Sequence, residues 1–212
     1  MRRLKGRCEG RERSSHRISQ VAGENMDSTE QDQIWYLTTA ELEAGLDYVR
    51  QSPKDEGTLK SIVVRPEVDQ RSVLQECAMS AEQGVQGDNW LHKGRPDVDG
   101  QILLMNARAI ELLARTPDRW ALAGDQLYVD LDLSEDNLQA GQRLALGSVI
   151  LEVTDKPHRG CAKFARRFGK EALEFVNSPQ GWQLHLRGIC TRVVQDGTAQ
   201  VGDRVVKIAN SI

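Results

Sequence analysis

The sequence of 212 residues lacks any long apolar run. A membrane-spanning helix needs about 20 consecutive apolar residues, so the sequence predicts no membrane protein. The N-terminal stretch also lacks the apolar core of a secretory signal peptide. A chain of this length usually forms one domain that buries a core of its own, which predicts a soluble, single-domain protein.

The sequence contains few cysteines, and their spacing does not fit a structural zinc site. The four cysteines are Cys8, Cys77, Cys161 and Cys190, and none stands in C-x-x-C spacing. This pattern argues against a structural zinc site. So few cysteines without a signal peptide are typical of reduced thiols, which predicts a cytoplasmic protein.

Charge is unevenly spread along the chain. The net charge of −3 argues against a nucleic-acid binder. Residues 1–25 carry seven basic and three acidic side chains, which is +4, so the remainder carries −7. Gly6, Gly10 and Gly23 interrupt the helix that a transit peptide would need. We interpret residues 1–25 as a disordered basic leader, or as upstream sequence translated ahead of a start at Met26.

A helix is predicted at residues 39–51. Thr38 and Glu41 fit a capping box, in which each side chain satisfies a backbone N–H of the other. The apolar face of this helix is formed by Leu42, Leu46 and Val49. We assign residues 26–57 to an N-terminal helical appendage that packs on the main domain.

Short strand patterns follow, punctuated by glycine and proline. The strand candidates are residues 62–64, 72–79, 101–105, 124–132, 142–146, 149–154, 182–186 and 202–206. Two late strands are joined through the turn signal Asp196-Gly197. Helices are expected after Asn106, and at 162–168 and 171–177. This pattern predicts a mostly-β fold with a few helices, a closed or half-closed antiparallel barrel at residues 58–210.

The segment from Asp155 to Lys170 carries the strongest chemical signal. Cys161 stands in its middle, immediately before a predicted helix. Its basic residues are Lys156, Arg159, Lys163, Arg166, Arg167 and Lys170. A helix start and nearby cations both favour a thiolate over a thiol. A thiolate can bind a soft metal or accept a sulfur atom as a persulfide.

The second half of the chain resembles the MOSC family, named for the C-terminal part of molybdenum cofactor sulfurase. The resemblance rests on the order and spacing of several short motifs around Cys161. These motifs are Gly124-Asp-Gln-Leu127, Val129-Asp-Leu-Asp-Leu133, Ala140-Gly-Gln-Arg-Leu144, Val149-Ile-Leu-Glu-Val153, Gly160-Cys-Ala-Lys-Phe164, Arg167-Phe-Gly169, Leu186-Arg-Gly188, Arg192-Val-Val194 and Val201-Gly-Asp203. Weaker similarity extends back to Ile62.

The resemblance implies a barrel-like fold and a link to molybdenum cofactor chemistry. In the family, the cysteine that matches Cys161 carries sulfur or binds molybdenum. Some members reduce N-hydroxylated compounds at a bound molybdenum cofactor (molybdopterin). Others are joined to a pyridoxal-phosphate cysteine desulfurase, for which this chain has no room. A cofactor donor or desulfurase, and an electron-donor protein, are therefore expected as separate partners.

The chain departs from the family pattern at two positions. His158-Arg159-Gly160 precedes the cysteine where many members place a proline directly before it, and Cys190 stands where a bulkier residue is usual. We expect Cys77 and Cys190 to be structural, although a disulfide between Cys161 and Cys190 is conceivable.

The candidate site residues follow from this segment and the resemblance. Cys161 is the expected catalytic residue and metal ligand, with His158 as a candidate proton donor or, alternatively, an ordinary loop histidine. The expected cofactor-binding residues are Arg159, Lys163, Arg166 and Arg187, although Arg166 and Arg167 cannot both face one site on a helix. Asp88 is expected to hydrogen-bond a neighbouring loop.

Three functions remain open at this point. The first is a molybdenum-dependent reductase of N-hydroxylated substrates, or a carrier of the cofactor or its sulfur. The second is a persulfide carrier that needs Cys161 and no metal. The third is a non-enzymatic β-barrel that binds an anionic partner through its basic loop.

Overall fold

The fold is described by a computed structural model for residues 36–92, 94 and 96–209. The expected leader at residues 1–25, including Cys8, lies outside the described residues. The strands in this part of the chain are β1 (Glu56–Val64), β2 (Ser72–Leu74), β3 (Glu76–Ser80), β4 (Gly84–Val85), β5 (Ile102–Asn106), β6 (Leu127–Asp130), β7 (Arg143–Leu146), β8 (Val149–Val153), β9 (Ile189–Gln195), β10 (Gly197–Gln200) and β11 (Arg204–Ile208).

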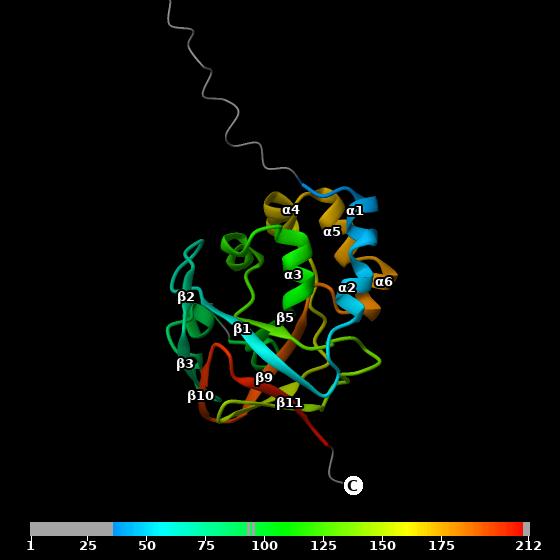
Figure 1. Cartoon of the computed structure of the whole chain (residues 1–212). Coiled ribbons are helices and arrows are strands. Elements are labelled where there is room, and N and C mark those ends of the chain that lie inside the picture. Colours follow the sequence, from blue (N-terminus) through cyan, green and yellow to red (C-terminus); the bar gives the residue numbers. More distant parts are fainter. Residues whose placement is uncertain (1–35, 93, 95, 210–212) are drawn as a thin grey trace, which may run out of the picture. The chain divides into compact units, whose positions relative to one another are not determined.

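The helices lie before, between and after groups of strands. They are α1 (Thr39–Ala44), α2 (Leu46–Arg50), α3 (Ala107–Ala114), α4 (Ala162–Phe168), α5 (Lys170–Val176) and α6 (Pro179–Gln183), with short 3₁₀ turns η1 (Asn89–His92), η2 (Val98–Gly100) and η3 (Pro117–Ala123). Figure 1 shows α1 to α6 grouped together on one side of the strands.

Seven strands close a barrel in the order β1, β11, β7, β8, β9, β5 and β6, with β6 pairing back onto β1. β2 pairs with the far end of β1, and β10, β3 and β4 form a separate small sheet. β5 and β6 pair in parallel, because α3 and η3 connect them. The other barrel pairs are antiparallel, so the expected mostly-β barrel is confirmed.

The barrel interior follows from side-chain alternation. Along β8, Val149, Leu151 and Val153 are buried, whereas Ile150 and Glu152 between them are partly exposed. The same alternation on neighbouring strands fills the barrel with aliphatic side chains. Each such side chain contributes about 1.5–3 kcal/mol when it leaves water.

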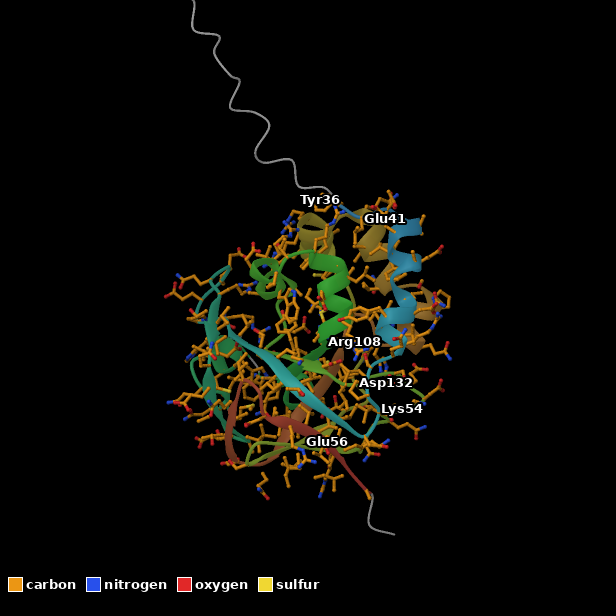
Figure 2. All side chains as sticks on the ribbon, viewed as in Figure 1. Tyr36, Glu41, Lys54, Glu56, Arg108 and Asp132 are labelled. Atoms are coloured by element: carbon orange, nitrogen blue, oxygen red, sulfur yellow. The ribbon has the colours of Figure 1, made fainter. Side chains whose placement is uncertain are left out.

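A second apolar cluster joins the helices to the outside of the barrel. The capping box is present, since Glu41 N–H donates to the Thr38 hydroxyl and the Glu41 carboxylate accepts from Thr38 N–H. Leu42, Leu46 and Val49 are buried in this cluster, as their spacing predicted. In Figure 2, Tyr36 and Glu41 lie at the helical end of the molecule, whereas Glu56 lies among the strands.

Three expected strand features were wrong in detail. Residues 182–186 belong to α6 and the turn after it, because the Ser178 hydroxyl caps the helix and Pro179 occupies its first turn. The strand expected at 72–79 is two strands, β2 and β3. The Asp196-Gly197 turn does not make a hairpin, since β10 pairs with β3 in the other sheet.

Candidate functional site

Cys161 occupies the N-cap position of α4, directly after the loop that leaves β8. The residue is extended and exposed, with a free thiol. Ala165 N–H donates to the Cys161 carbonyl oxygen at 3.0 Å, which starts the helix. The sequence-based expectation of a cysteine directly before a helix is therefore met.

The surroundings of Cys161 favour its thiolate form. Partial burial raises the pKa of the thiol, but the backbone N–H groups of Phe164 and Lys163 lower the pKa. The positive charges of Arg187 and Arg167 also lower it. The balance leaves the pKa of Cys161 below its ordinary value, so more thiolate is present at neutral pH than for a free cysteine.

A buried ionic group contacts the same loop at His158. The Arg187 guanidinium donates to a carboxylate oxygen of Asp125 at 2.6 Å, and also to the Ala123 carbonyl oxygen at 3.0 Å. The second Asp125 oxygen lies 3.5 Å from His158 Nδ1. Arg187 also stacks over the Phe164 ring at 5.1 Å, which connects this group to α4. Arg187 and His158, both expected site residues, are thus brought together.

His158 is neutral at physiological pH. Burial, followed by the positive charge of Arg187, lowers the pKa of its imidazole to about 3. Asp125 acts in the opposite direction without reversing the effect. His158 is therefore a weak proton donor in the form that the fold holds.

An arginine cluster surrounds this part of the loop, and we define it as Arg65, Arg71, Arg167 and Arg187. Arg65 forms a bidentate pair with Asp88, which confirms the hydrogen bonding expected for that carboxylate, and donates to the Gly124 carbonyl oxygen. Arg167 donates to the Leu122 carbonyl oxygen and to Asp69.

The arginine cluster holds buried donors without acceptors. In the described part of the chain, the Nε atoms of Arg71 and Arg187 are buried and have no hydrogen-bond partner. Burial and then the charges of Arg167 and Arg65 lower the pKa of the Arg71 guanidinium. Unsatisfied buried N–H groups and crowded positive charges both favour an anionic ligand.

The remaining expected cofactor residues lie at the edges of this region. Lys163 and Arg166 are exposed on α4. Arg159 lies over the Trp182 ring, with 4.8 Å between its guanidinium carbon and the ring centroid. Of the two adjacent arginines on α4, Arg167 is the one whose charge acts on Cys161.

Sequence reasoning missed several residues that shape the site. Asp125, Arg65, Arg71 and Asn177 come from distant parts of the chain and contact the site only after folding. Asp125 stands in the family-like segment Gly124–Leu127, which was the available signal for it. The other residues had no signal in the sequence.

A pocket of about 340 Å³ opens beside His158. Its walls include Leu138, Val153, His158, Trp182 and Cys190, and Glu135 and Asp155 also contribute. This volume is within the range of small-molecule sites, which are mostly apolar with a few polar groups.

The other described cysteines are unreactive by comparison. Cys77 and Cys190 are buried free thiols, and burial raises the pKa of each to about 11. The Cys161–Cys190 disulfide is not formed. Within residues 36–92, 94 and 96–209, no group of three or more His, Cys, Asp or Glu side chains could hold a metal ion.

Comparison with solved structures identifies the same fold. A structure described as an hypothetical protein has a TM-score of 0.53 at 17% identity, covering 74% of this chain and 69% of that chain. YiiM from Geobacillus stearothermophilus has a TM-score of 0.50 at 17% identity, with coverages of 74% and 77%. YiiM from Escherichia coli gives 0.49 at 18% identity, with coverages of 73% and 71%. No match was found among curated proteins.

The fold and the site define a closed β-barrel protein with an exposed cysteine whose thiolate is favoured. The model of the MOSC domain matches residues 84–206, which is more than half of the chain. The chain belongs to the MOSC domain family. No helix among the described residues is both long enough and apolar enough to cross a membrane.

Proposed function

We propose that this protein binds the molybdenum cofactor at the Cys161 loop and reduces N-hydroxylated substrates there. The observation that carries the proposal is the juxtaposition of an exposed, thiolate-favouring cysteine with Arg187, whose buried Nε atom lacks an acceptor. A thiolate suits a soft, high-valent metal, and arginines suit a phosphate. Membership of the MOSC domain family supports the same cofactor.

The residues present fit this cofactor in chemical type. Cys161 would provide the single protein thiolate, consistent with the absence of a multi-residue metal site in the described chain. The positive charges of Arg187 and Arg167, which act on Cys161, would attract its phosphate side. Arg159, Lys163 and Arg166 would add longer-range positive charge. When bound, the cofactor would supply two-electron redox chemistry.

The overall reaction converts N–OH into N–H and water, using two electrons and two protons. The electrons would come from a separate electron-donor protein. The pocket beside His158 would hold the substrate and exclude bulk water from one side. Because the pKa of His158 is about 3, we assign the proton supply to water, with the neutral His158 ring orienting that water.

The proposal is tested by measuring what the purified protein carries. The full chain, Cys161→Ser and the control Cys77→Ala are expressed in a host that makes the molybdenum cofactor. Molybdenum is measured by mass spectrometry and pterin by fluorescence after oxidation. We expect both in the wild type and the control, with molybdenum lost from Cys161→Ser because the thiolate ligand is gone.

One outcome would reject cofactor binding. If neither molybdenum nor pterin accompanies the wild type, while a known molybdoenzyme from the same cells is loaded, the proposal fails. Persulfide labelling at Cys161 would then separate a sulfur carrier from a non-enzymatic module. If the cofactor is present, reduction of an N-hydroxylated compound with an artificial electron donor tests the reaction itself.

A further inference from the structure

The residue before Cys161 is held by a single carboxamide. Gly160 N–H donates to Asn177 Oδ1 at 3.0 Å, and Asn177 Nδ2 donates to the Gly160 carbonyl oxygen at 3.1 Å. One side chain therefore satisfies both backbone groups of one residue, as a neighbouring strand would. Residues 155–161 have no strand partner, so this pair substitutes for one.

Gly160 lies close against α5, where an added Cβ would require neighbouring side chains or the loop to shift. A Cβ at this position would stand 2.7 Å from Leu173 Cδ1 and 3.0 Å from Val176 Cγ2. Both of those residues belong to α5, and Asn177 ends that helix. The close approach is what brings the Gly160 backbone within reach of the Asn177 carboxamide.

Asn177 is itself anchored to the helix that follows. The Trp182 indole N–H donates to the Asn177 carbonyl oxygen at 3.1 Å. Arg159 lies over the same Trp182 ring. Two consecutive loop residues, Arg159 and Gly160, are thus tied to Trp182 and Asn177, while Cys161 next to them makes no capping hydrogen bond of its own.

We propose that Asn177 is a positioning residue that fixes the Gly160–Cys161 peptide and thereby the direction of the Cys161 side chain. The thiol then stays close to the N–H groups of α4 and to the arginine charges. Its importance for the reaction rests on the proposed function, whereas the positioning itself does not. Asn177 could not be recognised from the sequence, because it stands 17 residues from Gly160.

The test measures the reactivity of Cys161 without any cofactor. The cofactor-free full chain is alkylated with iodoacetamide at pH 7, and modification of Cys161 is followed by peptide mass spectrometry. Asn177→Ala is expected to slow this alkylation roughly threefold to tenfold, because the released loop no longer holds the thiol beside the α4 N–H groups that favour its thiolate. Asn177→Asp is expected to slow it further, because a carboxylate cannot donate to the Gly160 carbonyl oxygen and repels it.

Asn137 provides a matched control. Its carboxamide also holds backbone, donating to the carbonyl oxygens of Lys54 and Asp132. Asn137→Ala is expected to lower the melting temperature about as much as Asn177→Ala, while leaving Cys161 alkylation unchanged. This comparison separates positioning from a general loss of stability.

A second variant covers the case in which Asn177→Ala does not fold. Gly160→Ala places a Cβ against Leu173, Val176 and the Asn177 carboxamide, so the loop or these side chains must shift, and it is expected to slow alkylation in the same way. Cys161 alkylation at or above the wild-type rate in the folded variants would overturn the assignment. If the wild type carries no molybdenum but the variants show slower Cys161 alkylation, the proposed function is rejected and the positioning role of Asn177 is retained.

Discussion

At the residue scale, the site depends on buried charges that are balanced within the fold. Asp125 is fully buried and is neutralised by Arg187, which is itself almost fully buried. Removing one member of such a pair usually costs several kcal/mol, because the other charge stays buried. His158 shares this environment, and the fold keeps its ring neutral. Because the folded protein keeps this ring neutral, the free energy of unfolding should depend on pH.

His158 is expected to weaken the protein as the pH falls. Its folded pKa of about 3 lies below the value of about 6.5 for an unfolded histidine. Between these values the unfolded chain binds the extra proton, so the free energy of unfolding decreases as pH is lowered from about 6.5 toward 3. His158→Asn should remove up to about 1.4 kcal/mol per pH unit of this slope.

The measurement is urea unfolding at a series of pH values between 4 and 7. His92→Asn serves as the control, because His92 is exposed. If His158→Asn keeps the wild-type slope, the imidazole is protonated in the folded protein, and the neutral ring assigned here is wrong.

At the element scale, local patterns predicted most strands and helices, and contacts between elements decided the rest. The capping box at Thr38, the Asn106 cap and the helices after Cys161 were visible because their signals lie within a few residues. The alternation in residues 182–186 resembled a strand, but the local cap at Ser178 prevailed. Parallel pairing of β5 with β6 had no local signal.

The candidate site likewise contains residues that have a local signal in the sequence and residues that have none. Cys161 and its basic neighbours could be predicted from one segment, and Arg187 came from the family resemblance. Arg71 and Asn177 could not be predicted, since they approach the loop from other elements. A high density of charge along the sequence can identify a functional loop. The side chains that orient this loop come from other elements and depend on how those elements pack.

Closure of the barrel leads to a prediction about Gly57 on β1. Gly57 stands where a Cβ would lie 2.0 Å from the Asp130 carbonyl oxygen on β6. Gly57→Ala should therefore force β1 away from β6 and lower the free energy of unfolding by about 3 kcal/mol. Gly87→Ala is the control: its φ of +84° is unfavourable for alanine, but nothing lies within 4 Å of an added Cβ.

Thermal unfolding of both variants distinguishes the steric effect of an added Cβ at Gly57 from the cost of an unfavourable backbone conformation at Gly87. The control should lose about 1 kcal/mol, which is the usual cost of a left-handed non-glycine residue. Equal losses in the two variants would mean that β1 adapts easily, and that Gly57 is not required for closure.

At the scale of the whole molecule, two apolar clusters share the barrel wall. One fills the barrel, and the other lies between the barrel and the helices. Neighbouring residues of one strand serve both: Leu104 on β5 faces the interior cluster, and Met105 faces the helical cluster. The loop with Cys161 leads from barrel strand β8 to α4, so its position depends on both clusters.

This sharing predicts that α1 and α2 unfold together with the barrel. Leu42 on α1 is fully buried in the helical cluster. Leu42→Ala should lower the free energy of unfolding by about 2–5 kcal/mol, whereas Leu91→Ala on the surface should change it by less than about 0.5 kcal/mol. Far-ultraviolet circular dichroism and tryptophan fluorescence should give coincident transitions in both variants. An earlier, separate loss of helical signal in Leu42→Ala would mean that α1 and α2 are an independent appendage, and that the Cys161 loop is held by the barrel and the later helices alone.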